Sequence, residues 1–295
     1  MDAKDFDRWV DTSLTAVEAA LDGLVPVQAP AGLGEAMRYA VLGGGKRLRP
    51  LLVLASCESV GGNVFAAMRA ACAVELIHAY SLVHDDMPCM DDDVLRRGKP
   101  TTHVAFGEAQ AMLAGDAMQA LAFEVLTPDE GIEPALQARL CSLLARAAGY
   151  DGMAGGQAID LASVGKPLDE TTLRDMHRRK TGVLLQASVL MGAACGPLSA
   201  VARQSLSDYG AALGLAFQVV DDILDVTQDS ALLGKTAGKD QEANKPTYVS
   251  VLGMEPARAL AQQLRSQAKA ALEASGLADT RWLSLLADCV VERDN

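Results

Sequence analysis

The segment from 64 to 86, VFAAMRAACAVELIHAYSLVHDD, constrains the fold of this chain more than any other. Its polar residues Arg69, Glu75, His78 and Asp85 recur at intervals near multiples of 3.5 residues, and the remaining faces are apolar. A helix with so narrow a polar stripe is buried on nearly all sides in a folded protein. The segment therefore predicts a long, buried helix.

Helical periodicity also runs through most of the remaining chain. Ala, Leu, Met and Val dominate a composition that is 50% hydrophobic and 4% aromatic, which favours helices over strands. We find no alternating strand pattern of useful length, and turn signals such as SVGGN, ACGP and GMEP separate the periodic segments. The sequence predicts one all-α domain over residues 1–295 with roughly ten helices. The further helical segments are 33–42, 50–60, 107–126, 134–148, 170–194, 200–227, 256–274 and 281–292.

The charge of the chain limits its partners and its location. A formal net charge of −12 and a pI near 4.8 argue against nucleic-acid binding, because no basic face forms over such a background. The N-terminus, MDAKDFDRWVD, is acidic, unlike a signal peptide, and no uncharged apolar run approaches the ~18 residues of a membrane span. The sequence thus predicts a soluble cytoplasmic protein.

The six cysteines are scattered and form no CxxC pair: Cys57, Cys72, Cys89, Cys141, Cys195 and Cys289. We expect them to be small buried side chains in a reducing compartment.

Two acidic clusters stand out against the apolar helices. Asp85 and Asp86 close the helix described above, and Asp91 follows six residues after Asp85. Pro88 lies between them, and the distortion that it causes could bring the carboxylates to one point. The second cluster, QVVDDILD, places its three acids near the end of another apolar helix: Asp221, Asp222 and Asp225.

A single cluster of this kind is usually a solvated helix end, but two clusters, each on an apolar helix, need another explanation. Carboxylates so close to one another repel, and a hard divalent cation such as Mg²⁺ relieves this repulsion. An EF-hand calcium loop is excluded, because the Gly and the Glu that it requires are missing. The sequence therefore predicts bound Mg²⁺.

Basic residues flank both clusters in loops that are partly rich in glycine: Lys46, Arg47 and Arg49 in GGGKRLRP, Arg96 and Arg97 in LRRGKP, Lys180 in RRKTG, and Lys235 and Lys239 in LGKTAGKD. Such loops suit the close approach of a polyanion. GGGKRLRP is not a Walker A motif, because it lacks the GKS or GKT ending and a preceding strand. Carboxylates that bind metal, with Lys and Arg opposite, predict a diphosphate site.

At these residues the sequence resembles the trans-isoprenyl diphosphate synthases. GGGKRLRP, SLVHDDMPCMDDDVLRRGKPTTH, GDA, GGQAIDL, KTG, FQVVDDILD and LGKTAGKDQEANKPTY occur in the family's order over nearly the whole chain. The spacing DDxxxxD in the first motif is similar to that of bacterial farnesyl and plant-type geranylgeranyl diphosphate synthases. The resemblance implies an isoprenoid-synthase-type helical bundle around a deep central cavity, usually as a homodimer.

The resemblance also implies a role for individual residues. Asp85 and Asp91 would bind two Mg²⁺ ions and Asp221 a third, and the supporting acids of the two motifs are Asp86, Asp222 and Asp225. The allylic diphosphate would contact Arg96, Lys180 and Lys235, with Thr181 and Gln218 beside the reacting carbon. The diphosphate of isopentenyl diphosphate would contact Lys46, Arg49, His78 and Arg97. His84, His103 and His177 are expected to be ordinary structural histidines, as are the acids Glu75 and Asp160.

The implied reaction joins isopentenyl diphosphate to an allylic diphosphate by ionisation, condensation and elimination. Tyr80 and Ser81 precede Asp85 on the same helix, where a Tyr can form the floor of the cavity. Spacing alone also allows Tyr80 to be a core aromatic. In the family an aromatic residue at this position goes with farnesyl products, so farnesyl diphosphate synthase is the leading hypothesis.

Three alternatives remain. A geranylgeranyl or geranyl diphosphate synthase of the same family differs only in product length. A class I terpene cyclase fits less well, because the second motif is DDxxD and the basic set is large enough for two diphosphates. A non-catalytic partner subunit would lack one acidic motif, and both are complete here.

Overall fold

The computed structural model describes residues 3–166, 168–227 and 247–293, and it confirms the all-α prediction. The longer helices are α1 (Ala3–Leu24), α2 (Leu33–Val41), α3 (Leu48–Ser59), α4 (Val64–Asp85), α6 (Glu108–Leu126), α7 (Pro134–Ala148), α8 (Met153–Ser163), α9 (Glu170–His177), α10 (Val183–Ala194), α11 (Ala200–Thr227), α15 (Met254–Ala274) and α16 (Arg281–Glu292). The short elements are η1 (Pro30–Gly32), β1 (Leu95–Arg96), β2 (Lys99–Pro100), α5 (Thr102–Phe106), η2 (Arg178–Gly182) and α14 (Tyr248–Leu252).

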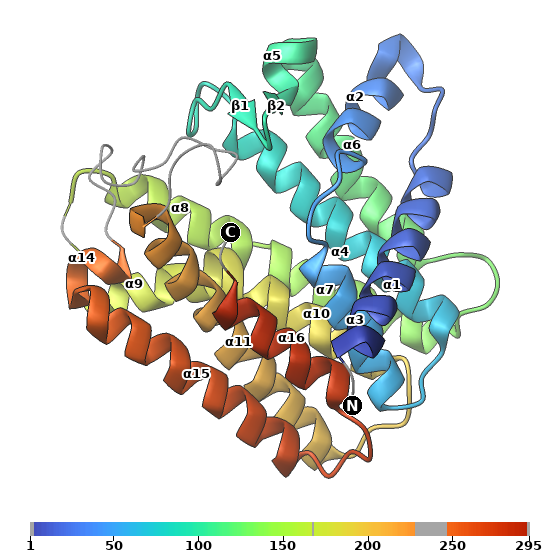
Figure 1. The fold of residues 1–295 in the computed structure, drawn as a ribbon. Helices are drawn as coiled ribbons and strands as arrows, with labels where there is room; N and C mark the ends of the chain where they lie inside the picture. Colours follow the sequence, from blue (N-terminus) through green and yellow to red (C-terminus); the bar gives the residue numbers. More distant parts are fainter. Residues whose placement is uncertain (1–2, 167, 228–246, 294–295) are drawn as a thin grey trace.

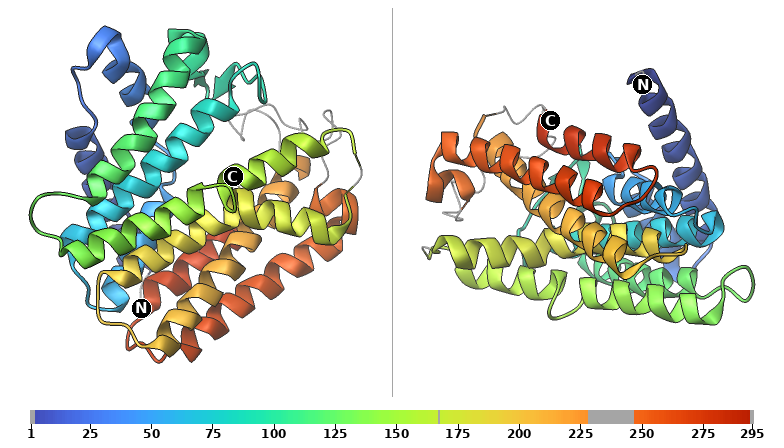
Figure 2. Two further views of the ribbon diagram at one scale, coloured as in Figure 1. Left: turned by 180° about the vertical axis from the view of Figure 1, so that it is seen from behind. Right: turned by 90° about the horizontal axis from the view of Figure 1, so that it is seen from below.

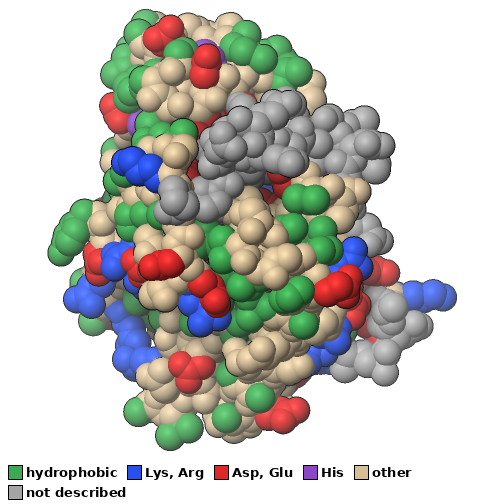
Figure 3. Space-filling model, turned by 90° about the vertical axis from the view of Figure 1, so that its left-hand side faces the viewer, with side chains coloured by type: hydrophobic (Ala, Val, Ile, Leu, Met, Phe, Trp, Pro, Cys, Tyr) green, Lys and Arg blue, Asp and Glu red, His purple; other side chains and the backbone are tan. Residues whose placement is uncertain are grey.

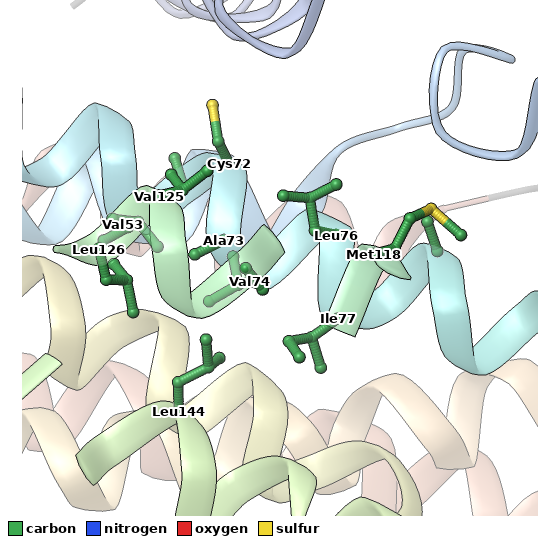
Figure 4. Close-up of a cluster of buried hydrophobic side chains, with 14 of the residues drawn as sticks. Val53, Cys72, Ala73, Val74, Leu76, Ile77, Met118, Val125, Leu126 and Leu144 are labelled. Carbon is green, nitrogen blue, oxygen red and sulfur yellow. The ribbon is translucent and has the colours of Figure 1, made fainter. Parts of the chain in front are cut away.

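The buried helix predicted over 64–86 is α4. It lies beside α6, as Figures 1 and 2 show, and it also packs on α3 and α10. Asn63 caps its first turn, because the side chain accepts a hydrogen bond from the Ala66 amide. Figure 4 shows the core around it, where Leu76 and Ile77 of α4 lie near Met118 of α6.

Among the described residues, α4 is also the one helix that is long and apolar enough to cross a membrane. In the structure, however, 72% of its apolar window is buried inside the protein, as in the core helix of a globular domain. The face in Figure 3, on the side of α8, α9 and α14, intermixes acidic, basic and hydrophobic side chains. The cytoplasmic location expected from the sequence stays a prediction.

The helix predicted over 170–194 is present, but its middle is not a regular α-helix. The five residues of η2 form a π-helical turn between α9 and α10. This turn lies against α8, where a β-carbon on Gly156 would come within 2.1 Å of the Lys180 nitrogen. Only glycine permits such an approach of two backbones. The insertion of a π turn at this point sets the direction of Lys180 and Thr181.

The sequence pattern also missed α1, α8 and the hairpin β1–β2. The hairpin occupies part of the predicted turn RRGKPTTH, with Leu95 opposite Pro100 and Arg96 opposite Lys99. Its two central residues, Arg97 and Gly98, have φ values of 52° and 73°. Two consecutive positive φ angles define the turn that matches the twist of a two-residue hairpin.

Candidate active site

The first acidic cluster occupies the end of α4 and the loop that follows. The Asp91 amide donates to the Asp85 carbonyl at 2.8 Å, and the Asp93 amide donates to the Asp86 carbonyl at 3.1 Å. The chain therefore folds back on the end of α4, as the Pro88 distortion led us to expect, and it brings Asp91 near Asp85. Burial raises the pKa of Asp85 to about 6; the Lys180 charge opposes this shift, and Asp91 adds to it.

Asp86 stabilises the loop and does not face the cavity. Its side chain is 3% exposed and accepts hydrogen bonds from Arg96, whose Nε lies 2.8 Å from Oδ2 and whose Nη2 lies 2.6 Å from Oδ1. Arg96, expected to contact the allylic diphosphate, thus holds Asp86, and its positive charge acts on Asp85 and Asp91 at the same time.

The π turn η2 connects the two acidic clusters. Lys180 Nζ lies 2.5 Å from Asp160 Oδ2, and the Lys180 charge also opposes the rise in the pKa of Asp85. The next residue, Thr181, donates its hydroxyl to Gln218 Oε1 at 3.1 Å. Gln218 in turn donates to Asp222 Oδ1 at 2.9 Å. The residue whose charge acts on Asp85 is therefore followed directly by Thr181, which two hydrogen bonds connect to Asp222 of the second cluster.

The three acids of the second cluster lie in different environments. Asp222 is buried and accepts a 2.7 Å hydrogen bond from the Tyr248 amide, which ties α11 to α14. Asp225 is also buried. Asp221 is half-buried, and its Oδ1 lies 3.5 Å from Nη2 of Arg293. Asp221 is therefore the member of this cluster that is placed to meet a ligand.

The residues expected to hold isopentenyl diphosphate form a basic group. Burial lowers the pKa of Arg49 to about 10, and burial together with the charges of Arg49 and Arg97 lowers the pKa of His78 well below 6.5. The Nε atom of Arg49 is buried and has no hydrogen-bond partner among the described residues. Crowded positive groups with an unsatisfied donor suit an anion. Burial and Arg293 also lower the pKa of Lys46.

The glycine run beside these residues has a steric role. Arg97 donates to the Gly44 carbonyl, and a β-carbon on Gly45 would lie 2.8 Å from the Arg97 guanidinium.

Arg47, in contrast, is not available to a ligand. It is 4% exposed and pairs with Glu18 at 2.7 Å and Glu75 at 2.6 Å. Glu75 is thus the structural acid that we expected.

A cavity of about 370 Å³ lies between α3, α4, α8 and η2. Arg49, His78, Asp85, Lys180 and Thr181 contribute polar groups to its wall, and Tyr80 and Ser81 line it as predicted. Tyr80 is 8% exposed, its hydroxyl is hydrogen-bonded to Gln119, and its ring meets His84 edge-on at 5.7 Å. The opposite wall is formed by α8, and sequence analysis had given its residues no role: Met153, Ala154, Gln157, Ala158 and Leu161.

Several expectations about site residues are settled by this geometry. Asp160 is structural in the sense that it fixes Lys180. Cys89 and Cys289 are exposed, so the expectation that all cysteines are buried is wrong for these two. Lys235 and Lys239 lie outside the described residues.

Comparison with known proteins decides the family. The model of the polyprenyl synthetase family matches residues 30–278. The chain belongs to this family. It is 46% identical over 297 residues to the large subunit 1 of the heterodimeric geranylgeranyl pyrophosphate synthase of Arabidopsis thaliana, covering 99% of this chain and 80% of that protein. Most of the curated relatives compared are named geranylgeranyl diphosphate synthases.

Solved structures of polyprenyl synthetases share the fold. An FPP/GFPP synthase from Zymomonas mobilis superposes with a TM-score of 0.88 at 41% identity, covering 98% of this chain and all of that one. A geranyltransferase from Helicobacter pylori, solved with magnesium and isoprenyl diphosphate, has a TM-score of 0.85 at 32% identity, with 99% and 97% covered. The chain is therefore a polyprenyl synthetase with the isoprenoid-synthase fold and prenyltransferase chemistry.

Proposed function

We propose that this prenyltransferase is a Mg²⁺-dependent geranylgeranyl diphosphate synthase. It adds isopentenyl diphosphate in turn to dimethylallyl, geranyl and farnesyl diphosphate. The observation that carries the reaction class is that the Lys180 charge acts on Asp85 while the adjacent Thr181 is hydrogen-bonded through Gln218 to Asp222 of the second acidic cluster, beside an apolar cavity. The names of the relatives support the twenty-carbon product.

The carboxylates fit Mg²⁺. Burial and the nearby charge of Asp91 both raise the pKa of Asp85. A cation bound between the two carboxylates would offset the cost of burying their charge and the repulsion between them. In the described part of the chain, no three His, Cys, Asp or Glu side chains converge on one point. Mg²⁺ characteristically uses one or two carboxylates together with water and substrate phosphate. Asp85, Asp91 and Asp221 are the residues proposed to hold it, and bound Mg²⁺ would neutralise charge on the diphosphate.

The side chains of the cavity perform the remaining tasks. Lys180 stabilises the negative charge that develops on the allylic diphosphate as its C–O bond breaks. Arg49 and His78 bind the second diphosphate, because they lie in the basic part of the same cavity. Thr181 presents its hydroxyl oxygen to the allylic cation, and Gln218 orients this hydroxyl by accepting its hydrogen bond. The apolar walls from α4 and α8 keep water away from this cation until the isopentenyl double bond attacks it.

Farnesyl diphosphate is the second candidate product, and Tyr80 is the observation that favours it. The ring lies in the cavity wall, where it would limit the growing chain if the product were farnesyl diphosphate. Our expectation of a farnesyl product was based on this residue, whereas the relatives favour geranylgeranyl diphosphate. For a twenty-carbon product, the chain would pass the Tyr80 ring along the α8 wall, beside the small side chains of Ala154 and Ala158.

Product analysis tests the proposal. The purified protein is incubated with isopentenyl diphosphate, dimethylallyl diphosphate and MgCl₂, and the dephosphorylated products are separated by chromatography. Geranylgeraniol as the main product supports the proposal, farnesol supports the second candidate, and the absence of any condensation product contradicts both. Addition of EDTA should abolish activity.

Variants of the acidic residues separate metal binding from folding. Asp85→Asn and Asp221→Asn should each lower kcat by about 10²-fold or more, because a ligand to the proposed cation loses its charge. Asp92→Asn is the matched control, since Asp92 lies in the same loop, is exposed, and has a φ of 52° that Asn tolerates. Full activity of the first two variants would contradict the assignment.

A further inference from the structure

Two of the turns noted in the sequence, SVGGN at 59–63 and ACGP at 194–197, meet away from the substrate cavity. The first follows α3 and the second follows α10. The Asn63 amide donates to the Cys195 carbonyl at 2.8 Å, and the Gly62 amide donates to the Cys57 carbonyl at 3.0 Å. Neither cysteine lines the cavity of the candidate active site. The proposed function therefore leaves this pair of turns unexplained.

Glycines bring the two turns into direct contact. A β-carbon on Gly196 would lie 2.7 Å from Val60 Cγ2 and 2.9 Å from Gly62 Cα. A β-carbon on Gly62 would lie 2.9 Å from both Cys57 Sγ and the Cys195 carbonyl carbon. Cys57 Sγ and the Cys195 carbonyl carbon are therefore both adjacent to Gly62. Any larger residue at position 62 or 196 would separate the cysteines.

The helices behind the turns hold the cysteines in place. Ser56 of α3 donates its hydroxyl to the Val189 carbonyl of α10 at 2.7 Å. A β-carbon on Gly192 would lie only 2.1 Å from the Val53 carbonyl oxygen, so the two backbones are in close contact. The Cys57 and Cys195 side chains are 2% and 7% exposed. Their relative position is thus fixed by packing, which a disulfide requires because its geometry is narrow.

The two thiols lie close enough for each to shift the pKa of the other, and the Cys195 thiol also donates to the Met191 carbonyl oxygen at 3.3 Å. Its interaction with Cys195 lowers the pKa of the Cys57 thiol, and burial opposes this change. The same contact and burial raise the pKa of Cys195. Cys57 is therefore the sulfur that ionises first, and Cys195 is the thiol beside it.

We propose that Cys57 and Cys195 are a modification site: a dithiol that is oxidised to an intramolecular disulfide linking the end of α3 to the end of α10. With hydrogen peroxide as oxidant, the Cys57 thiolate attacks one peroxide oxygen, the O–O bond breaks, and the departing hydroxide takes up the proton that the thiol released, which gives Cys57 sulfenic acid and water. Cys195 sulfur then attacks Cys57 sulfur, the S–O bond breaks, and a second water leaves. In total two thiols and one peroxide give one disulfide and two waters. A dithiol reductant reverses the reaction.

The link would join the far ends of two helices that begin at the candidate active site. Arg49 lies in the first turn of α3, and Thr181 lies in the turn that leads into α10. Both substrate-binding residues would then be attached to a cross-linked pair of helices. Because both sulfurs are buried, their oxidation would require local opening of the turns to admit the small peroxide.

Peptide mapping of the folded wild-type protein tests the proposal. The protein is treated with hydrogen peroxide, its remaining thiols are alkylated, and it is digested with trypsin without reductant. Cys57 lies in the peptide Leu48–Arg69, since the Arg49–Pro50 bond resists trypsin, and Cys195 lies in Thr181–Arg203. Each peptide contains a single cysteine, so a linked pair identifies the bond. The expected result is this linked pair, a fall from six to four free thiols, and their full recovery with dithiothreitol.

Variants and a stability measurement make the test decisive. Cys57→Ala and Cys195→Ala should each prevent the linked pair, whereas Cys141→Ala, in a half-buried position on α7, should leave it unchanged. Oxidation should raise the melting temperature of the wild-type protein by several degrees, because the bond closes a loop of more than a hundred residues. Mixed or intermolecular disulfides through Cys89 or Cys289 without the linked pair would overturn the proposal. Sulfinic acid at Cys57 as the main product would overturn it too.

Discussion

At the scale of the residue, Lys180 combines two tasks that are usually separate. Its ammonium group pairs with the buried Asp160 at 2.5 Å, and its charge also reaches Asp85. The pair fixes the direction of the side chain, so the charge needs no reorganisation when a diphosphate binds.

Lys180→Gln should therefore lower kcat/KM for the allylic substrate by about 10²-fold while keeping a hydrogen-bond donor for Asp160. The control is Arg178→Gln, a charge removal on the same π turn at an exposed position that pairs with Asp175. Steady-state kinetics check both variants, and equal activity of the two would contradict the role of Lys180.

His177 predicts a pH dependence of stability. Its imidazole is 6% exposed, both ring nitrogens lack a hydrogen-bond partner among the described residues, and burial lowers its pKa to about 4. Asp222 Oδ2 lies 3.8 Å from Nε2, but this contact is too long to offset burial. The unfolded chain takes up the proton near pH 6.5 and the folded chain near pH 4, so the unfolded state binds more protons between these values.

Stability is therefore lost as the pH falls from about 6.5 to about 4, by at most about 3 kcal/mol from this residue. His177→Phe keeps the stacking on Tyr248 and removes the titration. The difference in the free energy of unfolding between the two proteins, measured with urea in EDTA buffers, should change in favour of the variant as the pH falls. A difference independent of pH would refute this prediction.

Tyr80 predicts product length. Tyr80→Ala removes the ring from the cavity wall and should shift the products toward longer chains. Tyr80→Phe keeps the ring and removes only the hydrogen bond to Gln119, so its products should match those of the wild type. Chromatography of the dephosphorylated products measures both. An unchanged distribution in the Ala variant would mean that another residue forms the end of the cavity.

At the scale of the element, the close contact of α3 and α10 predicts a strict requirement for glycine. Gly192→Ala should destabilise the protein by about 1–3 kcal/mol, because the new carbon meets a backbone oxygen of α3 that has no room to move. Gly23→Ala in α1 is the control: it has no atom within 4 Å of the new carbon and should be neutral or stabilising by up to about 1 kcal/mol. Urea unfolding curves measure both.

The elements also show which features of the fold and of the site can be predicted from the sequence. The apolar faces of α4 and α11 and the acids at their ends are local patterns, so the periodicity predicted them. The π turn was not predicted, because it depends on the contact of Gly156 with Lys180, which lie on different helices. α8 was missed because its glycines weaken the helical pattern. Arg47 was named among the basic residues that flank the acidic clusters, and its pairing with Glu18 and Glu75 was not foreseen because it is a tertiary contact that sequence spacing does not encode.

At the scale of the whole molecule, an exposed strip on α6 predicts self-association. Met112 and Leu113 are 38% and 53% exposed, and Ala109 and Ala120 are exposed on the same helix. We expect a second copy of this chain to cover the strip, as the family resemblance implied. Sedimentation should give a dimer for the wild type, and Leu113→Glu should shift it toward the monomer, because a charge in such an interface is costly. A monomeric wild-type protein would contradict this prediction and would indicate that a different chain covers the strip.

The burial of α4 has a consequence for synthesis of the protein on the ribosome. Its neighbour α3 is synthesised before it, but α6 and α10 are encoded after it, and α10 ends at Ala194. At ordinary translation speeds the ribosome needs roughly 10 s to add those residues. Until that interval ends, a nascent chain carries a 22-residue apolar helix that lacks part of its cover. This is the period in which chaperones would have to shield it from aggregation or from membrane-targeting factors.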